Sequence, residues 1–154
     1  MPHKMVTPVI DLGVRSLCQK PYPNHPKGCP NFGKRSMCPP KCPNITSILD
    51  FAKPIYVIWN VFDFGGHCKR MESLHPNWSK RQIECCLYWQ GAARKHLRAE
   101  IKRFGWAHAN MKMVTCPEAA GVNVTATMAS IDIDLEWPPV TVAYQVALAG
   151  IKKN

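Results

Sequence analysis

Eight of the fourteen prolines in this 154-residue chain lie between Pro21 and Pro54, and half of its eight cysteines lie in or beside that stretch. Proline fixes φ and removes a backbone donor, so the stretch cannot form a long helix or a central strand. A long irregular segment is uncommon in a compact domain unless something fastens it. The side chains best suited to fasten it are four cysteines: Cys18, Cys29, Cys38 and Cys42.

The chemistry of these thiols depends on the compartment. The first residues, MPHKMVTPVIDLGV, contain no apolar run of signal-peptide type, and the longest apolar run, IYVIWNVF, is far too short to cross a membrane. We therefore expect a cytoplasmic protein with reduced thiols, in which metal binding is the first explanation for eight cysteines. A disulfide framework is the alternative explanation.

The spacing of the first four cysteines favours a soft metal without naming it. Zinc ribbons contain two short Cys-x-x-Cys hooks, and compact bacterial ferredoxins contain a closely spaced cysteine run; the sequence has neither. Scattered thiolates on a proline-stiffened loop suit a cubane [4Fe-4S] cluster, whose four irons point in different directions. Zinc is the alternative. His25 is either an exposed loop residue or a further ligand.

The later cysteines supply candidates for one more ligand. Cys116 ends an expected strand just before Pro117, and functional side chains often lie at strand ends in mixed α/β domains. Cys86 falls on the apolar face of an expected helix, as a buried hydrophobe or a ligand, while Cys85 points about 100° away from it. Cys68 is expected to be structural or incidental.

The remaining sequence predicts one domain over residues 1–154, with a cysteine-rich metal loop at 1–44 and a mixed core at 45–154. Runs of β-branched and aromatic residues and alternating patterns predict strands. The predicted strands, in chain order, are 54–64, 111–116, 131–137 and 140–150. The fold class is therefore α+β or α/β: a small mixed sheet with flanking helices.

Helices are expected between these strands. Short ones are predicted within 45–53, 63–74 and 117–130, the last with Asn123 as a cap. The clearest helix runs from Ser79 to Phe104, because apolar residues recur on one face, Ser79 and Gln82 form a capping box, and Gly105 is a natural stop.

The net charge of +10 favours an anionic partner: a nucleic acid, a nucleotide or an acidic protein. The predicted helix from Ser79 to Phe104 carries seven basic residues with Tyr88 and Trp89 between them, a pattern that suits phosphate contact and base stacking. The alternative is a helix that simply exposes its charges to solvent. The candidate contact residues are Lys34, Arg35, Arg94, Lys95 and Arg98.

Carboxylates offer little further chemistry. Asp132, Asp134 and Glu136 alternate along a predicted strand, which indicates a solvated sheet face or, as the alternative, a cation site. Glu118, close to Cys116, is the candidate acid–base residue.

Two segments resemble a known family. VRSLCQK at 14–20 with GCPNFGKRSMCPP at 28–40, and CPEAAGVNVTAT at 116–127, are similar to the signatures of an uncharacterised family of predicted metal-binding proteins, domain of unknown function 2284. The resemblance implies a metal or iron–sulfur centre with Cys18, Cys29 and Cys38 as ligands. Longer relatives carry another cysteine-rich stretch where this chain reads FGWAHANMKMVTC, so one centre is expected here.

The leading hypothesis is therefore a protein with one [4Fe-4S] cluster used for redox or substrate activation. Its ligands are Cys18, Cys29 and Cys38, with Cys116 or Cys42 as the fourth. An iron left open would act as a Lewis acid in an enzyme for a small, sulfur-containing or nucleotide-like substrate. One alternative is a zinc-stabilised basic nucleic-acid-binding module, and another is an accessory protein that passes metal or electrons to a redox partner.

Overall fold

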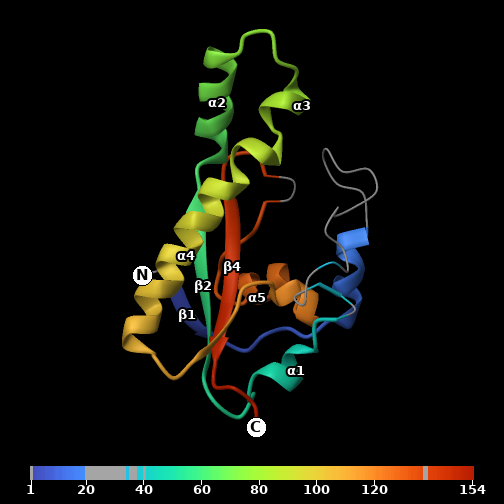
Figure 1. The fold of residues 1–154 in the computed structure, drawn as a ribbon, viewed down its shortest axis with the longest axis vertical. Coiled ribbons are helices and arrows are strands. Elements are labelled where there is room, and N and C mark those ends of the chain that lie inside the picture. Colours follow the sequence, from blue (N-terminus) through green and yellow to red (C-terminus); the bar gives the residue numbers. More distant parts are fainter. Residues whose placement is uncertain (1, 20–33, 35–37, 40, 137–138) are drawn as a thin grey trace.

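The computed structural model of the chain describes residues 2–19, 34, 38–39, 41–136 and 139–154. A four-stranded, fully antiparallel sheet forms its centre, in the order β1-β2-β4-β3 (Figure 1). The strands are β1 (His3–Val6), β2 (Ile55–Phe62), β3 (Lys112–Val114) and β4 (Ala143–Gly150). The predicted strands at 54–64, 111–116 and 140–150 are thus confirmed, and the fold is a small mixed α+β fold.

Helical segments connect the strands, and the longest of them lies against the sheet. They are η1 (Leu12–Gln19), α1 (Ile45–Ile48), α2 (Phe64–Leu74), α3 (Lys80–Ile83), η2 (Cys86–Tyr88), α4 (Gln90–Ala107), η3 (Pro117–Ala120) and α5 (Val124–Ala129). Asn123 caps α5 as predicted, since its side chain accepts a hydrogen bond from Ala126 N at 3.0 Å. None of the helices in the described residues is long and apolar enough to span a membrane.

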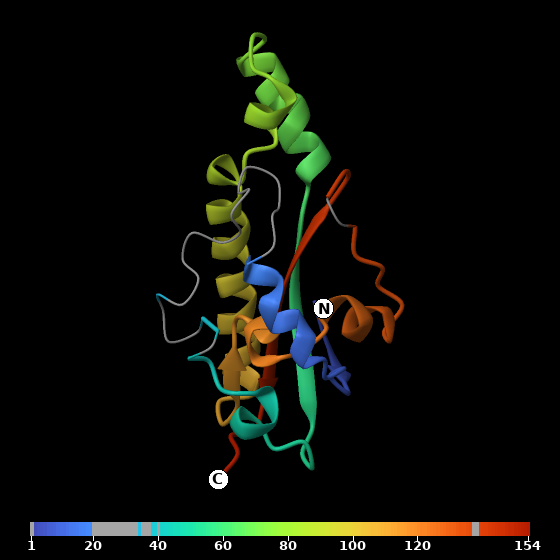
Figure 2. The same ribbon diagram turned by 90° about the vertical axis from the view of Figure 1, so that its right-hand side faces the viewer.

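The sheet buries both of its faces. Alternate side chains of a strand point to opposite faces, so Ile58 of β2 packs under Leu97 and Phe104 of α4, while its neighbour Val57 packs on the other side with Leu148 and the elements α1 and α5. Figure 2 shows α4 and α5 on opposite sides of the sheet. This two-sided burial explains why β2 is almost continuously apolar.

The predicted helix from Ser79 to Phe104 is wrong as a single element. The capping box is present, with Ser79 N donating to Gln82 Oε1 at 2.8 Å, but α3 ends at Ile83 and α4 begins only at Gln90. The break places the buried Trp89 ring beside that of Phe62, and its indole N–H donates to Glu84 O at 3.2 Å. α4 then continues past the predicted stop to Ala107.

The predicted strand at 131–137 is also wrong over its described residues, 131–136. Asp132 has a left-handed φ of 65°, which interrupts any extended run. Glu136 turns toward the chain that follows: its carboxylate accepts hydrogen bonds from the Thr141 hydroxyl and from Val142 N. The three carboxylates of this segment therefore do not form one face of a strand. In the N-terminal third, predicted as mostly irregular, β1 and η1 are regular elements.

Candidate metal centre

Backbone hydrogen bonds join the segment before Cys18 to the segment after Cys116. Asp11 N donates to Gly121 O at 2.7 Å, and Asn123 N donates to Val9 O at 2.8 Å. Gly121 has a φ of 89°, and a Cβ there would lie 2.6 Å from Leu12 Cδ2. Only glycine adopts this backbone without strain, so the sequence allows η1 to lie directly against η3. Figures 1 and 2 show both elements on the α5 side of the sheet.

Arg15 of η1 connects this pair to the end of the cysteine loop. Its guanidinium donates to Asn44 Oδ1 at 2.7 Å and to Cys42 O at 2.6 Å. Cys42 N in turn donates to Cys38 O at 3.0 Å, which closes a tight turn between these two cysteines. Cys18 lies three residues beyond Arg15, one turn along the 3₁₀ backbone. Arg15 was not predicted as a site residue. Its position in VRSLCQK, three residues before Cys18, was the sequence feature that could have indicated it.

The thiols of Cys38, Cys42 and Cys116 lie within electrostatic reach of one another. Burial raises the pKa of Cys42, the charge of Arg15 lowers it, and the thiolates of Cys116 and Cys38 raise it again. Desolvation by surrounding atoms likewise raises the pKa of Cys116, although solvent reaches the residue, and Cys38 raises it further. As thiolates these three soft donors would repel one another, and a nearby cation would favour their deprotonated forms.

These three thiols do not complete a metal site by themselves. In the part of the chain that the structure describes, no group of three His, Cys, Asp or Glu side chains is arranged to hold a metal ion. The predicted ligand Cys29 lies outside the described residues, as do His25 and Arg35, and of Cys18 only the backbone is described. The donor types therefore fit a thiolate-bound metal, whereas a complete ligand set would need the N-terminal cysteines as well.

The remaining predicted residues divide between this site and another cluster. Glu118 lies near Cys116, and its charge raises the pKa of that thiol, while desolvation raises the pKa of the Glu118 carboxyl itself. Arg94 of α4 lowers the pKa of Cys116, so one predicted anion contact borders the site. Cys86 and Cys68 instead pack in a cluster with Phe64, Trp89, Ala93 and Ala143. Lys34, Lys95 and Arg98 are exposed.

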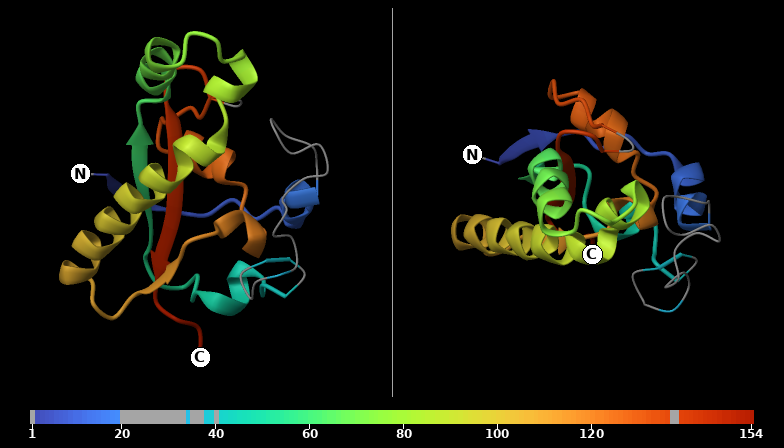
Figure 3. Two further views of the ribbon diagram at one scale, coloured as in Figure 1. Left: turned by 45° about the horizontal axis from the view of Figure 1, so that its top comes forward. Right: turned by 90° about the horizontal axis from the view of Figure 1, so that it is seen from above.

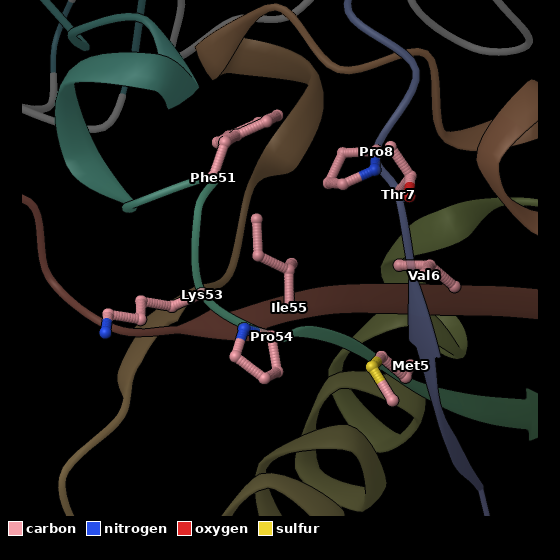
Figure 4. A pocket seen from close by; sticks show the side chains of 8 residues that line it. All are labelled: Met5, Val6, Thr7, Pro8, Phe51, Lys53, Pro54 and Ile55. Carbon is pink, nitrogen blue, oxygen red and sulfur yellow. The ribbon is translucent and has the colours of Figure 1, made fainter.

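A shallow hollow elsewhere offers no comparable chemistry. It has a volume of 390 Å³ and lies between the end of β1 and the segment that precedes β2 (Figure 4). Lys53 is its one charged lining residue, and Figure 4 shows the ammonium group directed away from the hollow. Its lining residues are Met5, Val6, Thr7, Pro8, Phe51, Lys53, Pro54 and Ile55. The lining has no thiol, imidazole or carboxylate, and the Met5 thioether is its one sulfur, so it has no group suited to acid–base catalysis.

Comparisons with known proteins do not extend these observations. No protein-family model, curated protein or solved structure matches this chain. The resemblance of its cysteine segments to the predicted metal-binding family therefore stays a prediction.

Proposed function

We propose that this protein carries one cysteine-ligated [4Fe-4S] cluster, held by Cys18, Cys29 and Cys38 with Cys42 as the fourth ligand, and that it serves in redox chemistry. The observation that supports the proposal is the turn in which Cys42 N donates to Cys38 O at 3.0 Å, while Cys116, from a segment more than seventy residues away in the sequence, raises the pKa of Cys42. When bound, such a cluster supplies one-electron transfer, at a potential that depends on nearby charges and hydrogen bonds.

The chain's own residues support Cys42 over Cys116 as the closing ligand. Cys42 is 2% exposed and lies one tight turn from Cys38, so it is held in place before a metal arrives. Burial raises the pKa of Cys42, and Arg15 partly opposes that shift and fixes the backbone of Cys42 through its carbonyl oxygen. Cys116 is exposed at the rim of the same group. It is the thiol that a solvent-side partner could approach.

The first test is metal and sulfide analysis of the protein purified without oxygen. We expect about four iron and four sulfide per chain and a broad absorbance near about 400 nm, as for a thiolate-bound cubane cluster. A colourless protein with one tightly bound zinc would contradict the cluster, and would leave the zinc-stabilised nucleic-acid-binding module as the better explanation.

Three serine variants then separate the ligands. Cys42→Ser is expected to lose most of the iron, whereas Cys116→Ser retains it. Cys68→Ser, whose thiol lies in the cluster around Phe64 and Trp89, is the matched control and is expected to keep the wild-type iron content. Iron loss in Cys116→Ser alone would move the fourth position to Cys116. Full iron retention by both Cys42→Ser and Cys116→Ser would refute a protein ligand at that position.

A further inference from the structure

The segment Phe64–Tyr88, here called the helical arm, stands beyond one end of the sheet. It contains α2, α3 and η2, at the top of the molecule in Figures 1 and 2. Leu74, Leu87 and Tyr88 are 65%, 81% and 51% exposed there. Exposed large apolar side chains that form a contiguous patch often mark a binding surface.

An aromatic stack lies on this arm. The rings of His75 and Trp78 are parallel within 6°, with centroids 3.7 Å apart, and Tyr88 lies 5.1 Å from Trp78 at a tilt of 33°. The stack joins the end of α2 to the turn before α4. His75 and Trp78 are half-buried and Tyr88 is exposed, so ring surface remains in contact with solvent.

Positive charge accompanies the stack along the arm and α4. Residues 64–107 contain nine Lys and Arg and three Asp and Glu, a net charge of +6 out of the chain's +10. Among the described residues, the ion pairs of this region are Lys80 with Glu84 and Arg103 with Glu100. Arg94, Lys95 and Arg98 are exposed, and none of them forms an ion pair with a carboxylate of the described residues.

We propose that the helical arm and α4 form a binding surface for single-stranded nucleic acid. Bases stack on the ring surface of Trp78 and Tyr88, while phosphates lie along Arg94, Lys95 and Arg98. Figure 3 shows that α4 begins directly beneath the arm. The eighteen residues of α4 extend over about 27 Å. Such a combination of a basic track and stacking rings binds strands without a fixed sequence.

The stacked rings favour a single strand over other polyanions. An acidic protein would be satisfied by the basic residues alone, and a duplex keeps its bases stacked on one another and hidden from the rings. The proposal does not require a metal at the cysteine site, although Arg94 influences the thiols of both Cys116 and Cys86.

Fluorescence anisotropy with labelled fifteen-nucleotide oligo(U), oligo(dT) and a duplex of equal length tests the proposal. We expect the single strands to bind more tightly than the duplex, with an affinity that falls steeply with salt. The triple variant Arg94→Gln, Lys95→Gln and Arg98→Gln is expected to bind at least tenfold more weakly and to lower the salt slope by about 2, because about 0.7 is lost per phosphate contact on a single strand.

The matched charge control is Lys53→Gln with Lys152→Gln and Lys153→Gln, which removes the same three charges from exposed residues outside the arm and α4. It is expected to change affinity less than threefold. Equal losses in the two triple variants would overturn the proposal, because binding would then follow net charge alone. Absence of single-strand binding at low salt would overturn it as well.

The ring contribution is tested at Tyr88, which is exposed and therefore tolerates replacement. Tyr88→Ala is expected to weaken oligo(U) binding at least fivefold, because each base stacked on an aromatic ring contributes substantially to affinity. Tyr88→Phe, which keeps the ring, stays within twofold of the wild type. Equal binding by both variants, equal affinity for the duplex, or equally effective competition by polyglutamate would each overturn the proposal, and the last would indicate an acidic protein partner.

Discussion

Replacing Gly121 with alanine tests the left-handed turn that allows η1 to pack against η3. The backbone at this position has a φ of 89°, a region that costs an L-residue about 1–2 kcal/mol. The new Cβ would also lie 2.6 Å from Leu12 Cδ2, but Leu12 is 53% exposed and its side chain can turn aside. The backbone cost therefore dominates, and we expect the free energy of unfolding to fall by about 1–2 kcal/mol. For a chain of this size, that corresponds to a Tm lower by about 2–8 °C.

Urea unfolding followed by circular dichroism measures this change, and Gly91→Ala is the matched control. A Cβ at Gly91, near the start of α4, meets no atom within 4 Å, and its φ is not left-handed. The same substitution there should stabilise the protein by about 0.5 kcal/mol, because alanine loses less backbone entropy in a helix. A Gly121→Ala protein as stable as the wild type would refute the argument that this turn requires glycine.

Two further changes test buried polar groups. Thr127 is 1% exposed and accepts a hydrogen bond from Val9 N at 3.0 Å, so Thr127→Val should lower the free energy of unfolding by about 1–3 kcal/mol in urea titrations. Thr125→Val, at an exposed position of the same helix, is the control, and an equal loss of unfolding free energy in both variants would contradict the role of the buried hydrogen bond. Burial, with a smaller contribution from a nearby arginine, lowers the pKa of His67. The unfolded chain therefore binds more protons, and stability should fall as the pH drops below about 6.5. His67→Asn should flatten this pH dependence of the free energy of unfolding, whereas His96→Asn, at an exposed position, should leave it intact. An unchanged pH dependence in His67→Asn would refute the role of His67.

Short-range sequence patterns correctly predicted those helices and strands whose signals lie within a few residues. The apolar run of β2, the Ser79 capping box and the Asn123 cap are all encoded within a few residues. The break before α4 is different, because the helical spacing of apolar residues continues through it. Trp89, expected beside Tyr88 as a base-stacking residue, is instead buried against Phe62 on the sheet, a contact between residues far apart in sequence. Tertiary packing of one large ring thus overrides a favourable helical pattern.

The predicted strand at 131–137 was wrong over 131–136 for a related reason. Alternation of Ile and acidic residues is the usual signal of a half-buried strand, but a strand also needs a neighbour to pair with. Here Ile131, Ile133 and Leu135 pack on the core beside α5 without joining the sheet, and Glu136 satisfies Thr141 and Val142 instead. Alternating burial was predicted correctly, whereas hydrogen-bond pairing is a non-local property that the alternation does not specify.

For the candidate site, the sequence supplies candidate residues but not their assembly. Cysteine content and proline stiffening identified Cys38, Cys42 and Cys116 as candidates, and the strand-end argument favoured Cys116. The arrangement of these cysteines depends on two contacts: the pairing of residues 9–12 with residues 121–123, and the hydrogen bond from Arg15 to Cys42 O. Neither contact can be read from the spacing of the cysteines in the sequence. Cys42, which the sequence left open as a ligand, is the thiol that both of the other two influence.

Cys42 also links the candidate metal centre to the folded body. It belongs to the same buried cluster as Ile45, Leu49 and Val57, whereas Cys38 and Cys116 lie outside that cluster. A metal bound through Cys42 would therefore restrain a residue that the hydrophobic core already holds, and its binding energy would add to the stability of the whole sheet. A metal bound only through the less buried Cys38 and Cys116 would leave the core almost unaffected. The burial of this one thiol would thus determine how strongly binding of the proposed metal is coupled to folding.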